Sequence, residues 1–397
     1  MSSSPGGLGI AQLDALLAPI PLGTTLALVN DPGVEPEPFL HQAAHRRLAA
    51  GGEVVYMLTA RGPGALRSAM AAHGFDPLPH GARLRVADLC SPLLGRSEGA
   101  PYELADPADL GRVAALLERA AREHPAALLV LEGLSTLADH AGEEAFEAAM
   151  PRLHVALRRF GVAIAQFTRW PYADPARLLQ GFHGLVALRG VEDRVRFGTY
   201  FAAERAAWVA DLDTAPRLYK VARPGGVVVY VPKVLVTGPH NAGKTSFVHS
   251  AAEGARSAEV GGTTVALDHG TATIDGLEAE LFGTPGQERF DPLLKTLAGQ
   301  ALGVIVVVDS TDPASFPRAR DMLQRVWTQG LPAILAANKQ DVPGALPAAA
   351  VERGVAPPQG VRALPCRATD PAEARHVLAA LLDQILRTPP PLQEVAP

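Results

Sequence analysis

A glycine-rich turn between an apolar run and a helical pattern constrains this sequence most strongly. Residues 234–250 read VLVTGPHNAGKTSFVHS and match the pattern GxxxxGK[ST]. Such a turn directs consecutive backbone N–H groups into one concavity at a helix N-terminus, where a lysine reaches the outer phosphates and a hydroxyl binds Mg²⁺. We therefore predict a triphosphate site, with Thr245 as a metal ligand. The residues expected to bind the nucleotide here are Gly238, Asn241, Ala242, Gly243, Lys244, Thr245 and Ser246.

Four further motifs follow this turn in a fixed order. Residues 263–268 read TTVALD, residues 282–290 read FGTPGQERF, residues 336–341 read AANKQD, and residues 366–370 read CRATD. Together with the glycine-rich turn they resemble the ordered motifs of Ras-type GTPases, over about residues 229–388. The resemblance implies a Ras-like P-loop fold that binds GTP or GDP with Mg²⁺ and hydrolyses GTP.

The last two motifs imply guanine recognition. Asp341 would accept two hydrogen bonds from the amide and amine edge of guanine, a donor pattern that adenine does not offer. Asn338 would orient the base and the loop, and the aliphatic stem of Lys339 would cover the ring face. Ala368 would donate its backbone amide to the base.

The motifs at residues 263–268 and 282–290 resemble the two switch segments of the family. Thr264 would be a second metal ligand that senses the γ-phosphate, and Gly286 would contact the nucleotide beside Gln287. Gln287 matches the glutamine that orients the attacking water, and we predict it as the catalytic residue. The family commonly has Asp where this chain has Gly283, so we expect weaker metal affinity. Bacterial Ras-like proteins related to the polarity GTPase MglA resemble the chain in this departure.

Alternation of short apolar runs with helical patterns predicts two α/β domains with mostly parallel strands. Residues 1–222 form the first expected domain and residues 229–388 the second, with the break in the turn-rich stretch 211–226. Residues 389–397 are proline-rich and are expected to form a tail. In the first domain we predict strands at 24–29, 53–58, 84–86, 127–131 and 162–167, helices at 38–50, 64–74, 107–123 and 143–159, and a more antiparallel tail over 184–210.

The first domain resembles a RecA-like ATPase domain of the KaiC type, over roughly residues 8–205. Its phosphate loop is degenerate, because Pro36 and Glu37 stand where the lysine and the hydroxyl are expected. The chain has only five lysines, and none precedes Lys220, so this domain contains no phosphate-loop lysine. Arg61 stands where that family has acidic catalytic residues, and Glu132 lies near the metal-side Asp position, where we expect a buried or capping carboxylate. We predict a domain that does not hydrolyse ATP.

Composition excludes several classes of function. A net charge of −5 gives no basic footprint for nucleic acid. Cys90 and Cys366 are too few for a disulfide framework or a Cys-based zinc site. The longest strongly apolar run, 302–308, is far shorter than the ~20 residues of a membrane span. We expect a cytoplasmic protein that does not insert into membranes.

The sequence therefore favours a GTP-hydrolysing molecular switch, with a regulator or effector protein, of roadblock type by resemblance, on its switch segments. The first domain is expected to serve as an interaction or homo-oligomerisation module. Three alternatives stay open: a nucleotide-bound scaffold with negligible hydrolysis, a first domain with an unseen ligand elsewhere in its fold, and, with less support, an ATP-driven RecA-like motor.

Overall fold

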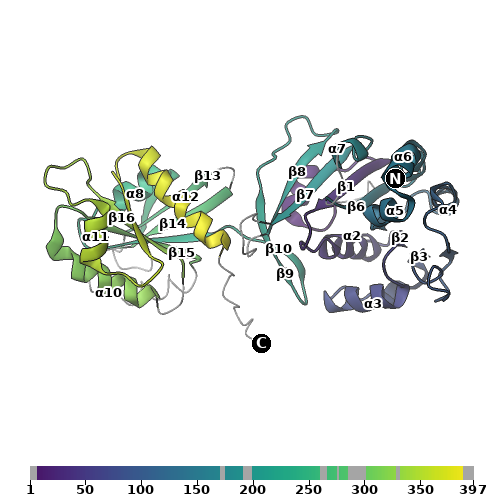
Figure 1. Cartoon of the computed structure of the whole chain (residues 1–397), viewed down its shortest axis with the longest axis horizontal. Helices are drawn as coiled ribbons and strands as arrows, with labels where there is room; N and C mark the ends of the chain where they lie inside the picture. The colour runs from purple at the N-terminus through teal and green to yellow at the C-terminus, as the bar shows by residue number, and fades with distance from the viewer. Residues whose placement is uncertain are drawn as a thin grey trace. The chain divides into compact units, whose positions relative to one another are not determined.

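The structure of the protein is a computed structural model that describes residues 7–169, 175–190, 199–259, 266–274, 277–284, 301–327 and 331–387. The chain forms two compact units, which divide between Tyr230 and Val231. Both are α/β units built on one sheet each (Figure 1). This confirms the predicted fold class, and each unit is described by itself.

The described residues of the N-terminal unit form a ten-stranded sheet in the order β10-β9-β8-β7-β1-β6-β5-β2-β3-β4. The strands from β7 through β1 to β4 in this order pair parallel. Strands β8, β9 and β10 continue the sheet beyond β7 with antiparallel pairing. A parallel core with an antiparallel edge in this order is a RecA-like sheet, as the sequence predicts. The strands are β1 (Thr24–Asn30), β2 (Val54–Leu58), β3 (Leu84–Asp88), β4 (Tyr102–Glu103), β5 (Leu128–Glu132), β6 (Val162–Thr168), β7 (Gly184–Gly190), β8 (Thr199–Ala206), β9 (Arg217–Ala222) and β10 (Gly226–Val229).

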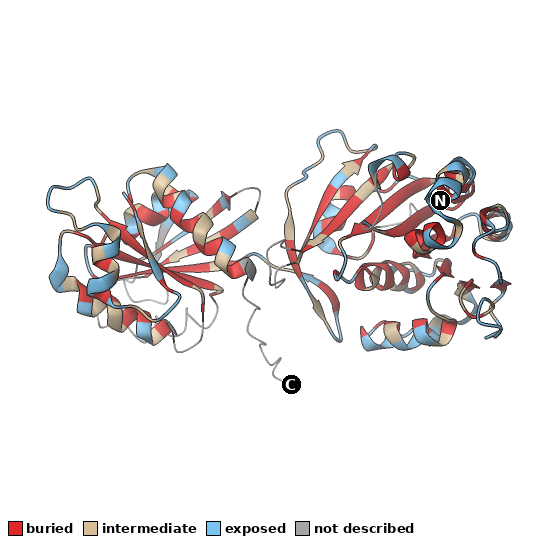
Figure 2. Cartoon of the chain, in the orientation of Figure 1, coloured by how far each residue is buried: buried red, intermediate tan, exposed pale blue. Residues whose placement is uncertain are grey.

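Helices cover both faces of this sheet. Side chains of α4, α5 and α6 form one apolar core with one face of the strands, and those of α1, α2 and α3 form a second core with the other. Because both faces are covered, β1, β2 and β5 are buried along their whole length (Figure 2). The helices are α1 (Ala11–Leu17), α2 (Glu37–Ala49), α3 (Pro63–Ala72), the 3-10 helix η1 (Leu78–Arg83), α4 (Leu110–Glu123), α5 (Leu134–Ala141), α6 (Glu143–Leu157) and α7 (Pro175–Leu178).

The C-terminal unit repeats the three-layer plan with a seven-stranded sheet among its described residues, in the order β12-β13-β14-β11-β15-β16-β17. Only the β12–β13–β14 meander is antiparallel. Helices α8 and α12 pack on one face, and α10 and α11 on the other. The elements are β11 (Lys233–Thr237), α8 (Lys244–Ala251), β12 (Glu253–Glu259), β13 (Ala266–Ile274), β14 (Leu277–Gly283), β15 (Gly303–Asp309), the 3-10 helix η3 (Pro313–Ser315), α10 (Phe316–Trp327), β16 (Ala333–Asn338), α11 (Ala348–Val355), β17 (Arg362–Pro365) and α12 (Pro371–Arg387).

The division between the units falls later than the expected break within 211–226. Strands β9 and β10 pair as an antiparallel hairpin, with Gly226 opposite Ala222 and Val229 opposite Tyr219. The turn formers of this stretch therefore close a hairpin of the N-terminal sheet instead of linking two domains. The expected proline-rich tail, 389–397, lies outside the described residues.

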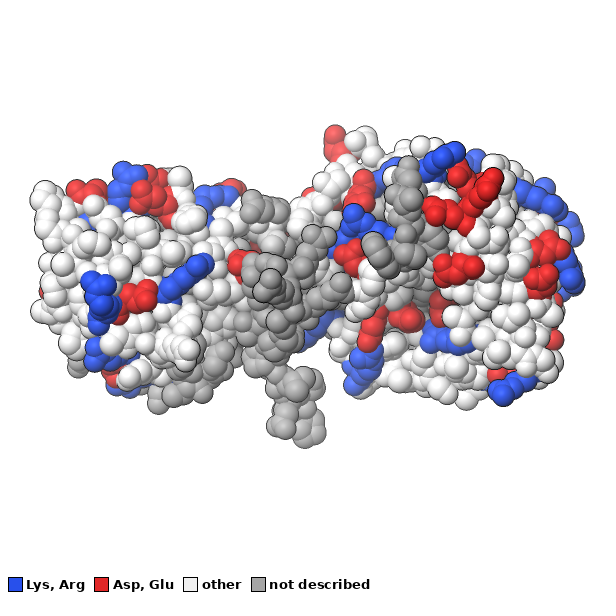
Figure 3. All heavy atoms as spheres, viewed as in Figure 1, with Lys and Arg blue, Asp and Glu red and all other residues white. Residues whose placement is uncertain are grey.

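The surfaces carry mixed charge. On the face that Figure 3 shows, acidic and basic side chains are interspersed over both units. Among the helices that the structure describes, none combines the length and the apolar character that crossing a membrane requires.

Candidate functional site

The glycine-rich turn connects the carboxyl end of β11 to α8, at the edge where the parallel strands of the C-terminal sheet end. Gly238 (φ 142°) and Gly243 (φ 99°) adopt backbone conformations that disfavour a side chain. A Cβ atom on Gly238 would lie 2.1 Å from the carbonyl oxygen of Val307, so the loop packs directly on the backbone of β15. Asn241 also has a positive φ, of 58°. The loop is thus shaped by close backbone approach, as a phosphate cradle requires.

Lys244 begins α8 and is buried, with 9 % of its surface exposed. Its Nζ donates a hydrogen bond of 2.6 Å to the carbonyl oxygen of Pro239. Burial lowers the pKa of Lys244 to about 8, and the charge of Asp268 opposes this shift. An anion entering the loop would therefore stabilise the ammonium form. Thr245 is exposed at the start of the helix, and Ser246 is half-buried.

Asn338 joins the phosphate loop to the last predicted base-binding loop. The side chain lies at the end of β16 and is 4 % exposed. Its Nδ2 donates to the carbonyl oxygen of Ala242 at 2.7 Å, and its Oδ1 accepts from the backbone N–H of Ala368, also at 2.7 Å. The structure thus brings three predicted site residues together. We expect the N–H of Ala368 to donate to the base, but in this structure it donates to Asn338. A direct hydrogen bond to a base therefore requires this N–H to change partner.

Lys339 and Asp341 follow Asn338 in the loop after β16. Lys339 has a positive φ of 66°, and its Nζ donates to Oδ2 of Asp309. The other oxygen of Asp309 accepts from the backbone N–H and the hydroxyl of Thr311, at 2.9 and 2.6 Å. Burial opposes ionisation of Asp309, but these hydrogen bonds outweigh it and lower the pKa of its carboxyl. Asp341 is exposed, as a carboxylate that meets a base from solvent must be.

Sequence reasoning missed that Asp309 orients Lys339. It also missed Thr284, whose hydroxyl donates to that of Thr237 at 2.8 Å and whose N–H donates to the carbonyl of Val236 at 2.9 Å. These contacts join the entry of the second predicted switch to β11. The sequence carried one signal for both residues, because a polar residue stands at or just after the end of each neighbouring strand. Thr264, Gly286 and Gln287 lie outside the described residues.

The donor set suits magnesium bound together with a nucleotide. Mg²⁺ usually keeps several waters and takes one or two protein oxygens plus substrate phosphates. Thr245 offers a hydroxyl at the loop, and Asp268 places a carboxylate close enough to influence Lys244. In the described part of the chain, no group of three or more His, Cys, Asp or Glu side chains is arranged to hold a metal alone.

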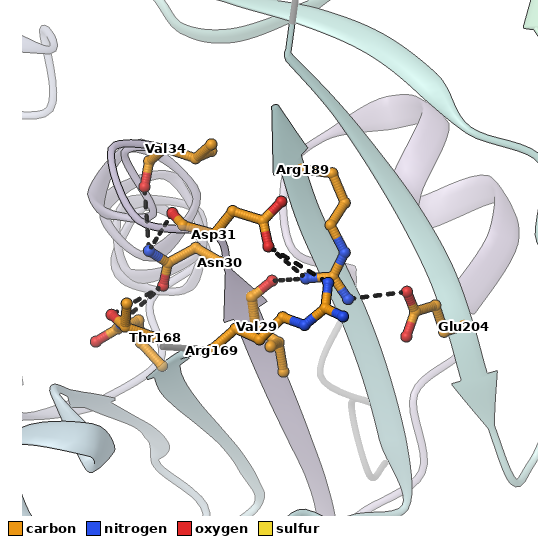
Figure 4. Close-up of polar contacts among 9 residues, drawn as sticks. Val29, Asn30, Asp31, Val34, Thr168, Arg169, Arg189 and Glu204 are labelled. Carbon is orange, nitrogen blue, oxygen red and sulfur yellow. Dashed lines mark hydrogen bonds and ion pairs between the residues drawn. The ribbon is translucent and has the colours of Figure 1, made fainter. Parts of the chain in front are cut away.

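The corresponding loop of the N-terminal unit, between β1 and α2, is filled by its own side chains. Nδ2 of Asn30 donates to the carbonyl oxygens of Asp31 and Val34, both at 3.2 Å. The Asp31 carboxylate lies 3.7 Å from Arg169 and 3.4 Å from Arg189 (Figure 4). The loop thus presents two carbonyl oxygens and a carboxylate to side chains of its own unit, whereas a phosphate cradle presents free N–H groups.

Glu132 lies at the end of β5, buried as expected, and is satisfied internally. Its Oε2 accepts from the hydroxyl of Tyr56 and from Nη2 of Arg61, both at 2.7 Å. The same guanidinium lies 3.0 Å from Nε2 of His41, whose Nδ1 is 2.9 Å from Nδ1 of His73. The guanidinium of Arg61 thus stands at the position where the resemblance to KaiC-type domains implies a catalytic acid.

Known proteins resemble parts of this chain. The Ras family model matches residues 233–386. Human ADP-ribosylation factor-like protein 4C is 36 % identical over 96 residues, which are 23 % of this chain and 49 % of that protein. Translation initiation factor IF-2 of Clostridium botulinum is 31 % identical over 117 residues, 29 % of this chain and 17 % of that protein. The chain thus spans about half the length, or less, of these curated relatives.

For the N-terminal unit, a solved KaiC-like protein of Pyrococcus horikoshii is similar at 17 % identity and a TM-score of 0.47, covering 56 % of this chain and 96 % of that one. The strand order of its sheet is that of the predicted RecA-like fold. Residues 233–386 match the Ras family model and form a Ras-like α/β domain, which in this chain follows a RecA-like α/β unit.

Proposed function

We propose that the protein is a cytoplasmic molecular switch that binds GTP with Mg²⁺ and hydrolyses it to GDP and phosphate. The contact that carries this proposal is the Asn338 bridge, because one buried amide fixes the phosphate loop and the base loop relative to each other. Asp341 stands exposed at the same strand end. A preformed phosphate cradle with a carboxylate at the base position favours guanine nucleotides over adenine nucleotides.

Hydrolysis needs little more than positioning and charge stabilisation from the protein. Bound Mg²⁺ would neutralise charge that develops on the phosphate oxygens, with Thr245 and Thr264 as its protein ligands. Lys244 contributes a second positive charge from the floor of the loop. Gln287 is proposed to orient the attacking water. Output would come from a regulator or effector protein, of roadblock type by resemblance, that binds the two switch segments.

The N-terminal unit is proposed to be a pseudo-ATPase that mediates interaction or homo-oligomerisation. Support comes from its phosphate-loop position, where Glu35 forms an ion pair with Arg223 and no lysine is available. ATP binding to the full chain carrying Lys244→Ala tests this idea, because that variant removes the phosphate-loop lysine of the C-terminal unit. Micromolar ATP affinity in this variant would contradict it.

Single-turnover hydrolysis of GTP by the full chain tests the switch itself. We expect measurable turnover in the native protein, a loss of roughly a hundredfold or more in Gln287→Ala, and loss of nucleotide binding in Lys244→Ala. An unchanged rate in Gln287→Ala would remove the catalytic assignment. The alternative, a nucleotide-bound scaffold, is favoured by Gly283, and tight GTP binding without hydrolysis would support it.

A further inference from the structure

Gly283, which departs from the Ras pattern, lies directly opposite a carboxylate. Strands β13 and β14 pair antiparallel, and their register places Asp268 opposite Gly283, the last residue of β14. Both positions are at the strand end that meets α8, since Val248 of that helix also borders Gly283. The segment that lacks the expected carboxylate therefore has one beside it, on the neighbouring strand.

A side chain at position 283 and the side chain of Asp268 would overlap in space. A Cβ atom built on Gly283 would lie 3.0 Å from Cβ and 3.3 Å from Oδ2 of Asp268. A contact of 3.0 Å is tighter than ordinary packing allows, and an aspartate at 283 would also bring two carboxylates together. Glycine at 283 thus leaves room for the side chain of Asp268, which occupies the region where a side chain at 283 would begin.

Asp268 is a largely buried carboxylate whose charge reaches Lys244 in the glycine-rich loop. Its side chain is only 11 % exposed. Its negative charge raises the pKa of Lys244 against the effect of burial, so the two groups interact. His249 is a neighbour of this carboxylate, with Nε2 3.9 Å from Oδ1. A largely buried carboxylate near Lys244 is stabilised further by a cation in the same site.

Resting on the proposed function, we propose that Asp268 replaces the missing aspartate of the second switch and holds a magnesium-bound water. Magnesium retains several waters when it binds with nucleotide phosphates, and groups that orient such waters contribute about 10- to 100-fold to metal affinity. Asp268 is a positioning residue in this scheme, because it acts on the metal through water. The chain therefore keeps tight magnesium binding, and with it slow nucleotide release, despite Gly283.

The test measures release of a fluorescent GDP analogue from the full chain as Mg²⁺ is raised from an EDTA-buffered zero to millimolar. We expect Mg²⁺ to slow release in the native protein, and Asp268→Asn to require about 10- to 100-fold more Mg²⁺ for the same effect. The matched control is His249→Ala, which removes the neighbouring imidazole and should leave the Mg²⁺ midpoint unchanged. Release in EDTA should be similar in all three proteins.

The swapped double variant, Asp268→Gly with Gly283→Asp, removes the Cβ at 268, returns the carboxylate to the family position and should restore the native Mg²⁺ midpoint. An unchanged midpoint in Asp268→Asn would overturn the proposal while leaving GTP binding intact. If Asp268→Asn does not fold, the swapped variant decides alone, and a folded swap with a midpoint raised tenfold or more would overturn it. Failure of the native protein to bind the GDP analogue would instead reject the proposed function.

Discussion

Replacement of Asn338 by alanine should destabilise the C-terminal unit even without nucleotide. The change removes both bridging hydrogen bonds and leaves the carbonyl of Ala242 and the N–H of Ala368 without that partner, in residues that are 0 % and 2 % exposed. Each buried group left unpaired costs about 1–3 kcal/mol, so the free energy of unfolding should fall by roughly 2–6 kcal/mol. This is a large part of the ~5–15 kcal/mol that holds a domain folded.

Calorimetric unfolding of the full chain measures this effect. For a unit of this size about 1 kcal/mol shifts Tm by roughly 2–4 °C, so the transition of the C-terminal unit should fall by at least about 4 °C. Added GDP raises Tm because it binds the folded state. Since the variant lacks the bridge between the two loops, GDP should raise its Tm by less than it raises that of the native protein. The transition of the N-terminal unit should not move.

The matched control is Gln340→Ala. Gln340 also donates two side-chain hydrogen bonds, to the hydroxyl of Ser310 and the carbonyl of Leu346, at 2.8 and 3.0 Å. It is half-buried, so water can replace it, and the loss should be about 1 kcal/mol or less with the GDP effect retained. A nucleotide-free Asn338→Ala protein whose Tm falls no further than that of Gln340→Ala would refute the bridge as a structural element.

Three further predictions concern the base, the pH and the N-terminal network. Asp341→Asn should weaken GTP binding by about 10- to 100-fold and favour xanthosine triphosphate, because the amide offers a donor in place of an acceptor; competition binding measures this, and unchanged GTP affinity would contradict it. Burial, then Arg61 and His73, lowers the pKa of His41 to about 3. The unfolded chain therefore binds more protons between pH 6.5 and 3, and the N-terminal unit should lose stability as pH falls through that window; His41→Gln should flatten the pH profile in denaturant titrations. Arg61→Met leaves Glu132 as a buried charge with one partner fewer, and should cost about 3–5 kcal/mol. The double variant with Glu132→Gln should cost clearly less than the sum of the single changes, and additive losses would reject the coupling.

Much of the fold could be predicted from local patterns. Five apolar runs of the first half became β1, β2, β3, β5 and β6, and four helical patterns became α2, α3, α4 and α6. Patterns of this kind are legible because strand and helix periodicities are set within a few residues. The turn formers near the end of 211–226 close the β9–β10 hairpin, and local sequence does not distinguish such a hairpin from a linker because both use the same residue types.

The candidate site divides in the same way. The sequence by itself located the glycine-rich loop between β11 and α8, because its glycines, Lys244 and Thr245 lie within one short local window. It also determined that the first half has no phosphate-loop lysine, because none precedes Lys220. Only the tertiary structure decided that Asn338 bridges to Ala242, that Arg61 fills the place of an acid beside Glu132, and that Asp268 faces Gly283. These contacts depend on sheet order and strand register, which bring together residues that no local window of sequence contains.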